Sequence, residues 1–222
     1  MKPEIIIAIS IGTVAMFGVM AFCRRWYKSI SLIKLLIAAP LLTASGTVGA
    51  YLLFFVENGE FGGISFYGSL FLIPVLFIPV SLLLRTKFGE LTDLCAPSVA
   101  LMLAINKINC IRTNCCKGMV IGEDSNGNEI RFPSQIVELV AALAIMAILI
   151  YFMSKEKFRK EMYPAFLVIY GVVRFGLNLL RETSPFVWIL PAGNFWSLVA
   201  IAAGILWIAV YRFVKKRKAK EL

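Results

Sequence analysis

The sequence predicts an all-α polytopic membrane protein with seven transmembrane helices, its N-terminus outside the cell and its C-terminus in the cytoplasm. Hydrophobic residues make up 59% of the 222 positions, and the mean hydropathy of +0.82 indicates a chain far more apolar than ordinary soluble domains. Several apolar runs approach the roughly 20 residues that cross a bilayer as a helix. We therefore expect residues 1–222 to form a single transmembrane helical domain.

Seven apolar segments are separated by short polar or charged segments, and each is expected to be one membrane span. The first ends at the basic pair Arg24 and Arg25, and the third ends at Arg85. The fourth is less apolar than the others and leads into a polar, cysteine-rich cluster at residues 106–118. The expected spans are residues 5–22, 31–56, 64–84, 90–105, 134–153, 164–180 and 195–213.

The basic residues are sorted between alternate loops. Most of the 23 Lys and Arg residues follow the first, third and fifth spans or lie in the C-terminal tail. Cytoplasmic loops of membrane proteins carry such an excess, which gives the predicted orientation. The same rule accounts for the net charge of +10 without nucleic acid as a partner. The basic residues expected on the outer side are Lys2, Lys107, Arg112, Lys117, Arg131 and Arg181.

The absence of histidine and the spacing of the cysteines exclude several kinds of site. A chain with no histidine has no His general base and no His-ligated metal. The five cysteines include no CxxC pair, so a zinc or thioredoxin-type site is not expected, and we predict neither a metal nor a cofactor. Cys110 could form a disulfide with Cys115 or Cys116 in an oxidising exterior. The alternative is that these are small residues packed in a tight loop.

Polar side chains from five spans are expected at one level, in the outer leaflet. Arg174, Asn178 and Arg181 are spaced i, i+4 and i+7, so they share one helix face. Arg174 lies well inside an apolar span, where an arginine without a partner is costly. The other residues expected at this level are Tyr67, Lys107, Gln135, Glu138 and Asn194.

Simpler roles remain open for some of these residues. Tyr67 and Asn194 could be ordinary interfacial residues, and Gln135 with Glu138 could cap the fifth helix. Charged residues that we expect to be structural or solvated are Lys34 and Asp93, which could pair with each other, and Lys117 and Arg131.

A group of arginine and lysine side chains at this depth suits a phosphate, because guanidinium binds phosphate oxygens bidentately. Within the bilayer, and open sideways to lipid, the natural ligand is a phospholipid head group. Glu138 could orient one of the arginines. The residues themselves therefore predict an anionic phospholipid site in the outer leaflet.

Six short motifs, in order along the chain, resemble those of prolipoprotein diacylglyceryl transferase, a bacterial membrane enzyme with seven spans in this orientation. The matching segments are 61–69 (FGGISFYGS, like GG-x-x-F-H-G-G), 93–97 (DLCAP, like D-x-x-A-P), 110–118 (CIRTNCCKG, like C-F-x-x-G-C-C-x-G), 132–138 (FPSQIVE, like P-x-Q-x-x-E), 170–175 (YGVVRF, like Y-G-x-x-R-F, followed by Arg181) and 193–197 (GNFWS, like G-Q-x-x-S).

The resemblance implies transfer of the diacylglyceryl group of phosphatidylglycerol to the lipobox cysteine thiol of a preprolipoprotein signal peptide, with release of glycerol phosphate. The reaction would take place at the outer leaflet of the bacterial inner membrane. Catalysis would fall to Arg174, Lys107 and Tyr67, with Arg174 stabilising charge on the departing phosphate. The implied substrate-binding residues are Arg181, Gln135, Glu138, Asn178, Gly118, Arg112 and Asn194.

Several positions depart from the family pattern. Tyr67 stands where the family has a histidine, and Lys107 stands where it has the signature arginine. Cys115 and Asn178 occupy positions that are usually acidic, and Asn194 replaces a glutamine. These departures leave open a second hypothesis, a non-catalytic or retasked paralogue that binds phospholipid or an accessory partner. A small transporter is a third hypothesis, disfavoured because the charges within the spans gather at one face.

Overall fold

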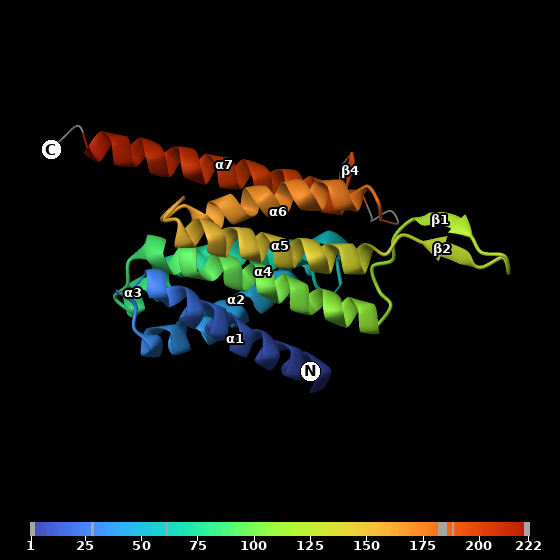
Figure 1. Cartoon of the computed structure of the whole chain (residues 1–222), viewed down its shortest axis with the longest axis horizontal. Helices are drawn as coiled ribbons and strands as arrows, with labels where there is room; N and C mark the ends of the chain where they lie inside the picture. Colours follow the sequence, from blue (N-terminus) through green and yellow to red (C-terminus); the bar gives the residue numbers. More distant parts are fainter. Residues whose placement is uncertain (1–2, 28, 61, 182–185, 188, 220–222) are drawn as a thin grey trace. The chain divides into compact units, whose positions relative to one another are not determined.

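The computed structural model describes residues 3–27, 29–60, 62–181, 186–187 and 189–219. Over these residues the chain forms seven α-helices, one short 3-10 helix and two small antiparallel sheets (Figure 1). The elements are α1 (Pro3–Cys23), η1 (Arg24–Trp26), α2 (Leu32–Asn58), α3 (Phe66–Leu83), α4 (Phe88–Arg112), β1 (Val120–Glu123), β2 (Glu129–Arg131), α5 (Ser134–Ser154), α6 (Met162–Asn178), β3 (Phe186–Val187), β4 (Leu190–Pro191) and α7 (Ala192–Lys218).

The helices have the length and surface of membrane spans. Among the described residues, α2, α3, α4, α5 and α7 are long and apolar enough to cross a bilayer, and α6 is a shorter apolar helix. Large apolar side chains such as Ile33, Leu82 and Leu206 are exposed on the helix surfaces, where water would be unfavourable and lipid is not. The chain is therefore an integral membrane protein. The count of seven spans and the orientation of the termini stay predictions.

The fourth helix is longer than the sequence predicted. It was expected over residues 90–105, but α4 continues to Arg112 because residues 106–112 contain neither glycine nor proline to end it. Lys107 is consequently a helix residue, and the helix gives way at Asn114, whose φ of 50° is left-handed. The loop that follows contains the β1–β2 hairpin, which the sequence did not predict.

The chain divides into two compact units, of which the first comprises residues 1–102 and 146–163. Within it, α2 and α3 approach closely at small residues. A Cβ atom on Gly49 would lie 2.3 Å from the carbonyl oxygen of Gly68, and the Ser69 hydroxyl donates to the Gly46 carbonyl at 2.6 Å. Small residues at such a crossing let two helix backbones pack in contact, as is common between membrane helices.

Asp93 is fully buried in this first unit and accepts several hydrogen bonds. The Tyr27 hydroxyl donates to it at 2.5 Å, and the backbone N–H groups of Lys160 and Met162 donate at 2.5 and 2.9 Å. Lys34 donates instead to a main-chain carbonyl at 3.2 Å. The prediction that Lys34 and Asp93 pair was therefore wrong, because neutral donors from the chain itself satisfy the buried carboxylate.

The second unit comprises residues 103–145 and 164–222. Within it, α6 and α7 run side by side (Figure 1). A Cβ on Gly171 would lie 2.9 Å from the Ser197 carbonyl oxygen, and a Cβ on Gly204 would lie 2.7 Å from that of Pro164. These two glycines allow α6 and α7 to pack in backbone contact, which fixes the helix that carries Arg174.

Candidate functional site

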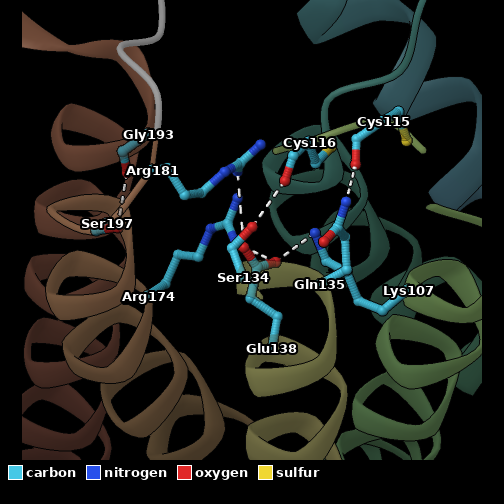
Figure 2. Close-up of polar contacts among 10 residues, drawn as sticks. All are labelled: Lys107, Cys115, Cys116, Ser134, Gln135, Glu138, Arg174, Arg181, Gly193 and Ser197. Atoms are coloured by element: carbon cyan, nitrogen blue, oxygen red, sulfur yellow. Dashed lines mark hydrogen bonds and ion pairs between the residues drawn. The ribbon is translucent and has the colours of Figure 1, made fainter. Parts of the chain in front are cut away.

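Three basic side chains in the second unit surround one carboxylate, that of Glu138 on α5. Lys107 extends from α4 and Arg174 from α6, and both pair with Glu138 Oε2. Arg181, which follows the end of α6, places Nη1 3.8 Å from Glu138 Oε1. Figure 2 shows the two arginines reaching Glu138 from one side and Lys107 reaching it from the other. The structure thus brings together four predicted site residues, from three helices and from the segment that follows α6.

These four side chains are almost entirely removed from solvent. The Glu138 side chain is 4% exposed, and the side chains of Lys107, Arg174 and Arg181 are 9%, 12% and 15% exposed. Three cations and one carboxylate leave an excess of two positive charges within the cluster. Buried charges need a partner of opposite sign. The cluster is therefore suited to an anionic ligand that carries one or two negative charges.

Gly118 lies where three chain segments meet beside Arg181. It pairs with Arg181 as an isolated β-bridge, and the Met119 N–H donates to the Leu180 carbonyl at 3.1 Å. A Cβ on Gly118 would lie 2.1 Å from the Phe132 carbonyl oxygen, closer than any side chain can come. Glycine at this position therefore lets the segment after α4 contact both the segment before α5 and the end of α6, which sets the position of Arg181.

The loop between α4 and β1 is attached to the start of α5 by two side chains. Ser134 Oγ donates to the Cys116 carbonyl at 2.8 Å, and Gln135 Nε2 donates to the Cys115 carbonyl at 2.7 Å (Figure 2). Gln135 is therefore attached to the loop, and the alternative in which it caps the fifth helix with Glu138 stays a prediction. Ser134 was not predicted as a site residue. A serine directly after Pro133 is a signal for the start of a helix. The sequence does not show that its hydroxyl binds the Cys116 carbonyl, because that carbonyl lies 18 residues earlier.

Two asparagines of the second unit present buried polar atoms. Asn178 Nδ2 and Asn194 Oδ1 have no hydrogen-bond partner among the described residues, and the same holds for Arg181 Nε. The Asn178 side chain packs against Gly193, where an added Cβ would lie 2.6 Å from its Nδ2. Because a buried polar atom without a partner is costly, these groups are available to hydroxyl or ester oxygens of a bound molecule.

A small, mostly apolar pocket adjoins the charged cluster. Its walls come from α4, α5 and α6, and its lining includes Glu138, Arg174 and Tyr170. The remaining lining residues are Leu103, Ala141, Ala142, Ile145, Val173 and Leu177. Cations beside an apolar pocket are the arrangement that an amphiphilic anion requires.

The other predicted residues lie apart from this cluster or outside its unit. Tyr67 is buried in the first turn of α3, in the first unit, so its predicted place beside the cations stays a prediction. Arg112 ends α4 and is exposed, in none of the ion pairs of the described residues, and Lys117 is also exposed. Arg131 pairs with Glu129 of the hairpin at 2.6 Å.

The three loop cysteines are free thiols that cluster. The Sγ atoms of Cys110, Cys115 and Cys116 all lie within 4.8 Å of one another. The pKa of Cys116 is lowered to about 5, first by the hydrogen bond from the Cys110 thiol and then by the positive charges of Lys107 and Arg181. The cysteines that were expected as a disulfide or as packing residues thus form a compact group of sulfur atoms beside the cations.

Comparison with known sequences identifies relatives along most of the chain. The family profile described as prolipoprotein diacylglyceryl transferase matches residues 5–210. Phosphatidylglycerol–prolipoprotein diacylglyceryl transferase of Teredinibacter turnerae is 31% identical over 160 residues, covering 65% of this chain and 55% of the relative. A Clostridium perfringens protein of that name, numbered 2, is 25% identical over 212 residues, covering 85% and 82%.

The Bordetella parapertussis protein of the same name is 30% identical over 141 residues, covering 60% of this chain and 53% of the relative. The matched region thus spans about half the length of the Teredinibacter and Bordetella relatives, and about four-fifths of the Clostridium one. The family profile, over residues 5–210, includes the segments that carry Glu138 and the three cations.

Proposed function

Because the chain belongs to the prolipoprotein diacylglyceryl transferase family, we propose that it transfers the diacylglyceryl group of phosphatidylglycerol to the lipobox cysteine of a preprolipoprotein signal peptide. The observation that carries this proposal is the buried cluster of three cations around Glu138, adjoining an apolar pocket. The reaction belongs at the outer leaflet of the bacterial inner membrane, which is where the lipid substrate and the exported acceptor peptide meet.

The cation cluster binds the phosphate of the lipid in this proposal. Arg174 and Arg181 present guanidinium groups, which match phosphate oxygens, and Lys107 supplies a point charge. The apolar side chains of α4, α5 and α6 beside the cations would face the apolar part of the same lipid. Asn178 and Asn194 offer polar atoms for glycerol or ester oxygens. Gly118 and Gln135 position the loop above the head group rather than contact the reacting atoms.

The charge of the cluster suits the departing group better than the intact lipid. A phosphodiester carries one negative charge, whereas the glycerol phosphate that leaves is a monoester that carries about −1.5 to −2 at neutral pH. Since the four side chains have an excess of two positive charges, their attraction grows as the bond to the phosphate breaks. An interaction that strengthens toward the transition state lowers the barrier of the chemical step.

The transfer is a substitution at the glyceryl carbon next to the phosphate. The thiolate of the acceptor cysteine forms the C–S bond, the C–O bond to the phosphate breaks, and glycerol phosphate leaves with the electron pair. Tyr67 is the proposed acceptor of the thiol proton. A tyrosine with its ordinary pKa of about 10 would be a poor match for this task, so the role requires nearby positive charge. Replacement of Tyr67 by Phe tests it through the pH dependence of transfer.

The proposal is tested by incubating the purified protein in phosphatidylglycerol-containing nanodiscs with a lipobox peptide. Mass spectrometry of the peptide and an assay of glycerol phosphate should show coupled formation of both products. Arg174→Ala should reduce transfer by two orders of magnitude or more, as expected for a lost charge-stabilising donor, about 10²–10³-fold. Arg159→Ala is the matched control, because that arginine lies in the first unit, where it pairs with Glu156, and it should transfer at the wild-type rate.

The result that contradicts transferase activity is a folded protein that yields no lipidated peptide. If that protein still binds phosphatidylglycerol and loses binding on Arg174→Ala, the non-catalytic phospholipid-binding paralogue is the function instead. This second candidate is favoured because the chain has Tyr67 and Lys107 at positions where the family pattern has histidine and arginine. Equal transfer by Arg174→Ala and the wild type would contradict the role of Arg174 while leaving transferase activity itself in place.

A further inference from the structure

We propose that Cys110, Cys115 and Cys116 form a binding site for a thiophilic metal ion, with Zn²⁺ as the probe for the test. The proposal concerns the loop after α4 and does not depend on lipid transfer. The sulfur atoms of the three residues lie within 4.8 Å of one another, and all three are free thiols. No other described group of three such ligand residues has this arrangement.

The distances are close to those that a metal imposes. A Zn–S bond of about 2.3 Å places the sulfur atoms of a tetrahedral site about 3.8 Å apart. Sulfur atoms within 4.8 Å of one another therefore reach this geometry by side-chain rotations and shifts of about 1 Å. Three cysteines leave a fourth position for water or another external ligand, since the chain contains no histidine and no Asp or Glu joins the group among the described residues.

The backbone already holds the loop in the shape that gathers the sulfurs. Asn114 and Cys116 have left-handed φ angles of 50° and 58°, which are unfavourable for residues with side chains. These turns bring Cys115 back over the end of α4, where its N–H donates to the Cys110 carbonyl at 3.1 Å. The Thr113 hydroxyl donates to the Asn109 carbonyl at 3.0 Å and lies 3.4 Å from Cys115 Sγ, so it packs beside this sulfur atom.

Two further contacts fix the loop from α5. Ser134 and Gln135 donate to the carbonyls of Cys116 and Cys115, so the main chain of both cysteines is tied down while their sulfur atoms remain free to bind. A site whose ligands are held in place before binding loses less conformational entropy when the metal enters.

The electrostatic surroundings also favour thiolate ligands. Three thiolates and one Zn²⁺ carry a net charge of −1. The charges of Lys107 and Arg181 act on Cys116 and offset this excess. Soft thiolate ligands select Zn²⁺ and Cu⁺ over hard cations such as Mg²⁺ and Ca²⁺, so selectivity for thiophilic ions follows from the ligand set.

The test is direct titration of the reduced, purified full-length protein in detergent with Zn²⁺, without lipid or peptide. One Zn²⁺ should bind per chain in competition with a chromophoric chelator, and Cd²⁺ as a second probe should give a thiolate charge-transfer band. Mass spectrometry after alkylation should find Cys110, Cys115 and Cys116 protected by the metal. This protection measurement uses the wild-type chain and so does not depend on any variant folding.

Cysteine-to-serine variants locate the site. Cys110→Ser, Cys115→Ser and Cys116→Ser should each weaken Zn²⁺ binding at least tenfold, whereas Cys95→Ser, at a buried cysteine of the first unit, should bind as the wild type does. Arg174→Ala should also bind Zn²⁺ normally, which separates this proposal from the transferase. Absence of binding by the reduced wild type, or binding that survives all three loop substitutions, would overturn the proposal.

Discussion

Removing the charge of Glu138 should destabilise the protein far more than removing the charge of an exposed glutamate. Glu138→Gln keeps the shape of the side chain and leaves three cations, at most 15% exposed, without their shared carboxylate. At the 3.8 Å that separates Glu138 from Arg181, one ion pair is worth about 4 kcal/mol at an effective dielectric constant of about 20, before desolvation. Breaking a buried pair costs about 3–5 kcal/mol net.

The matched control is Glu129→Gln in the β1–β2 hairpin. Glu129 also pairs with an arginine, Arg131, at 2.6 Å, but its side chain is 56% exposed whereas that of Glu138 is 4% exposed. An exposed pair contributes about 0–1 kcal/mol. Both variants should therefore be measured by denaturant unfolding in the same detergent, and the free energy of unfolding should fall by about 3–5 kcal/mol for Glu138→Gln alone.

Anionic lipid provides a second measurement on the same variant. With the carboxylate gone, the three cations should bind phosphatidylglycerol and recover part of the lost stability, because a ligand that binds the folded state stabilises it by mass action. Phosphatidylcholine, which has no net charge, should restore less. Equal free energies of unfolding for the two glutamine variants would refute the interpretation that Glu138 holds the cations together.

Two further predictions concern the segments around the cluster. Gly118→Ala should lower stability by about 1–3 kcal/mol and impair transfer, because its Cβ would lie 2.1 Å from the Phe132 carbonyl oxygen. Gly122 has open space around it, so the control variant Gly122→Ala should match the wild type in thermal unfolding and in activity. In the hairpin turn, hydrogen bonds from the Asn128 side chain and from backbone N–H groups lower the pKa of Asp124. The hydrogen bonds to the Asp124 carboxylate therefore stabilise the turn fully above the ordinary carboxyl pKa, and this stabilisation is lost as the pH falls through the lowered pKa. Amide exchange at Asn128 should accelerate only under strongly acidic conditions. Loss of protection already at pH 6 would contradict the lowered pKa of Asp124.

Part of the site followed from the sequence because it depends on local spacing. Arg174 and Asn178 lie four residues apart on α6, which places them on one helix face. Arg181 was expected on the same face, but it lies beyond the end of α6, where it pairs with Gly118. Glu138 lies four residues after the start of α5, which places it near the N-terminal end of that helix. The gathering of these residues with Lys107 was predicted, and the structure places the three cations around the Glu138 carboxylate; their role as a site stays a prediction. Tyr67 lies in the first unit, and its role stays a prediction.

Contacts between segments distant in sequence could not be predicted. Asp93 has donors from two distant segments rather than the expected Lys34, and Gln135 binds a loop carbonyl 20 residues away in the sequence. Ser134 escaped notice because its partner, the Cys116 carbonyl, lies 18 residues earlier. In each case several donors or acceptors of suitable type were available along the chain, and only packing selected one.

The sequence by itself determined that this is a helical membrane protein, because long apolar runs have no other stable environment than lipid and must satisfy their backbone hydrogen bonds within each helix. It also determined which residues share a helix face. Only the tertiary structure decided that three cations share one carboxylate, that three chain segments pack together at Gly118, and that the sulfur atoms of three loop cysteines lie close together. Helical periodicity fixes neighbours within one turn, whereas contacts between helices depend on how their surfaces pack.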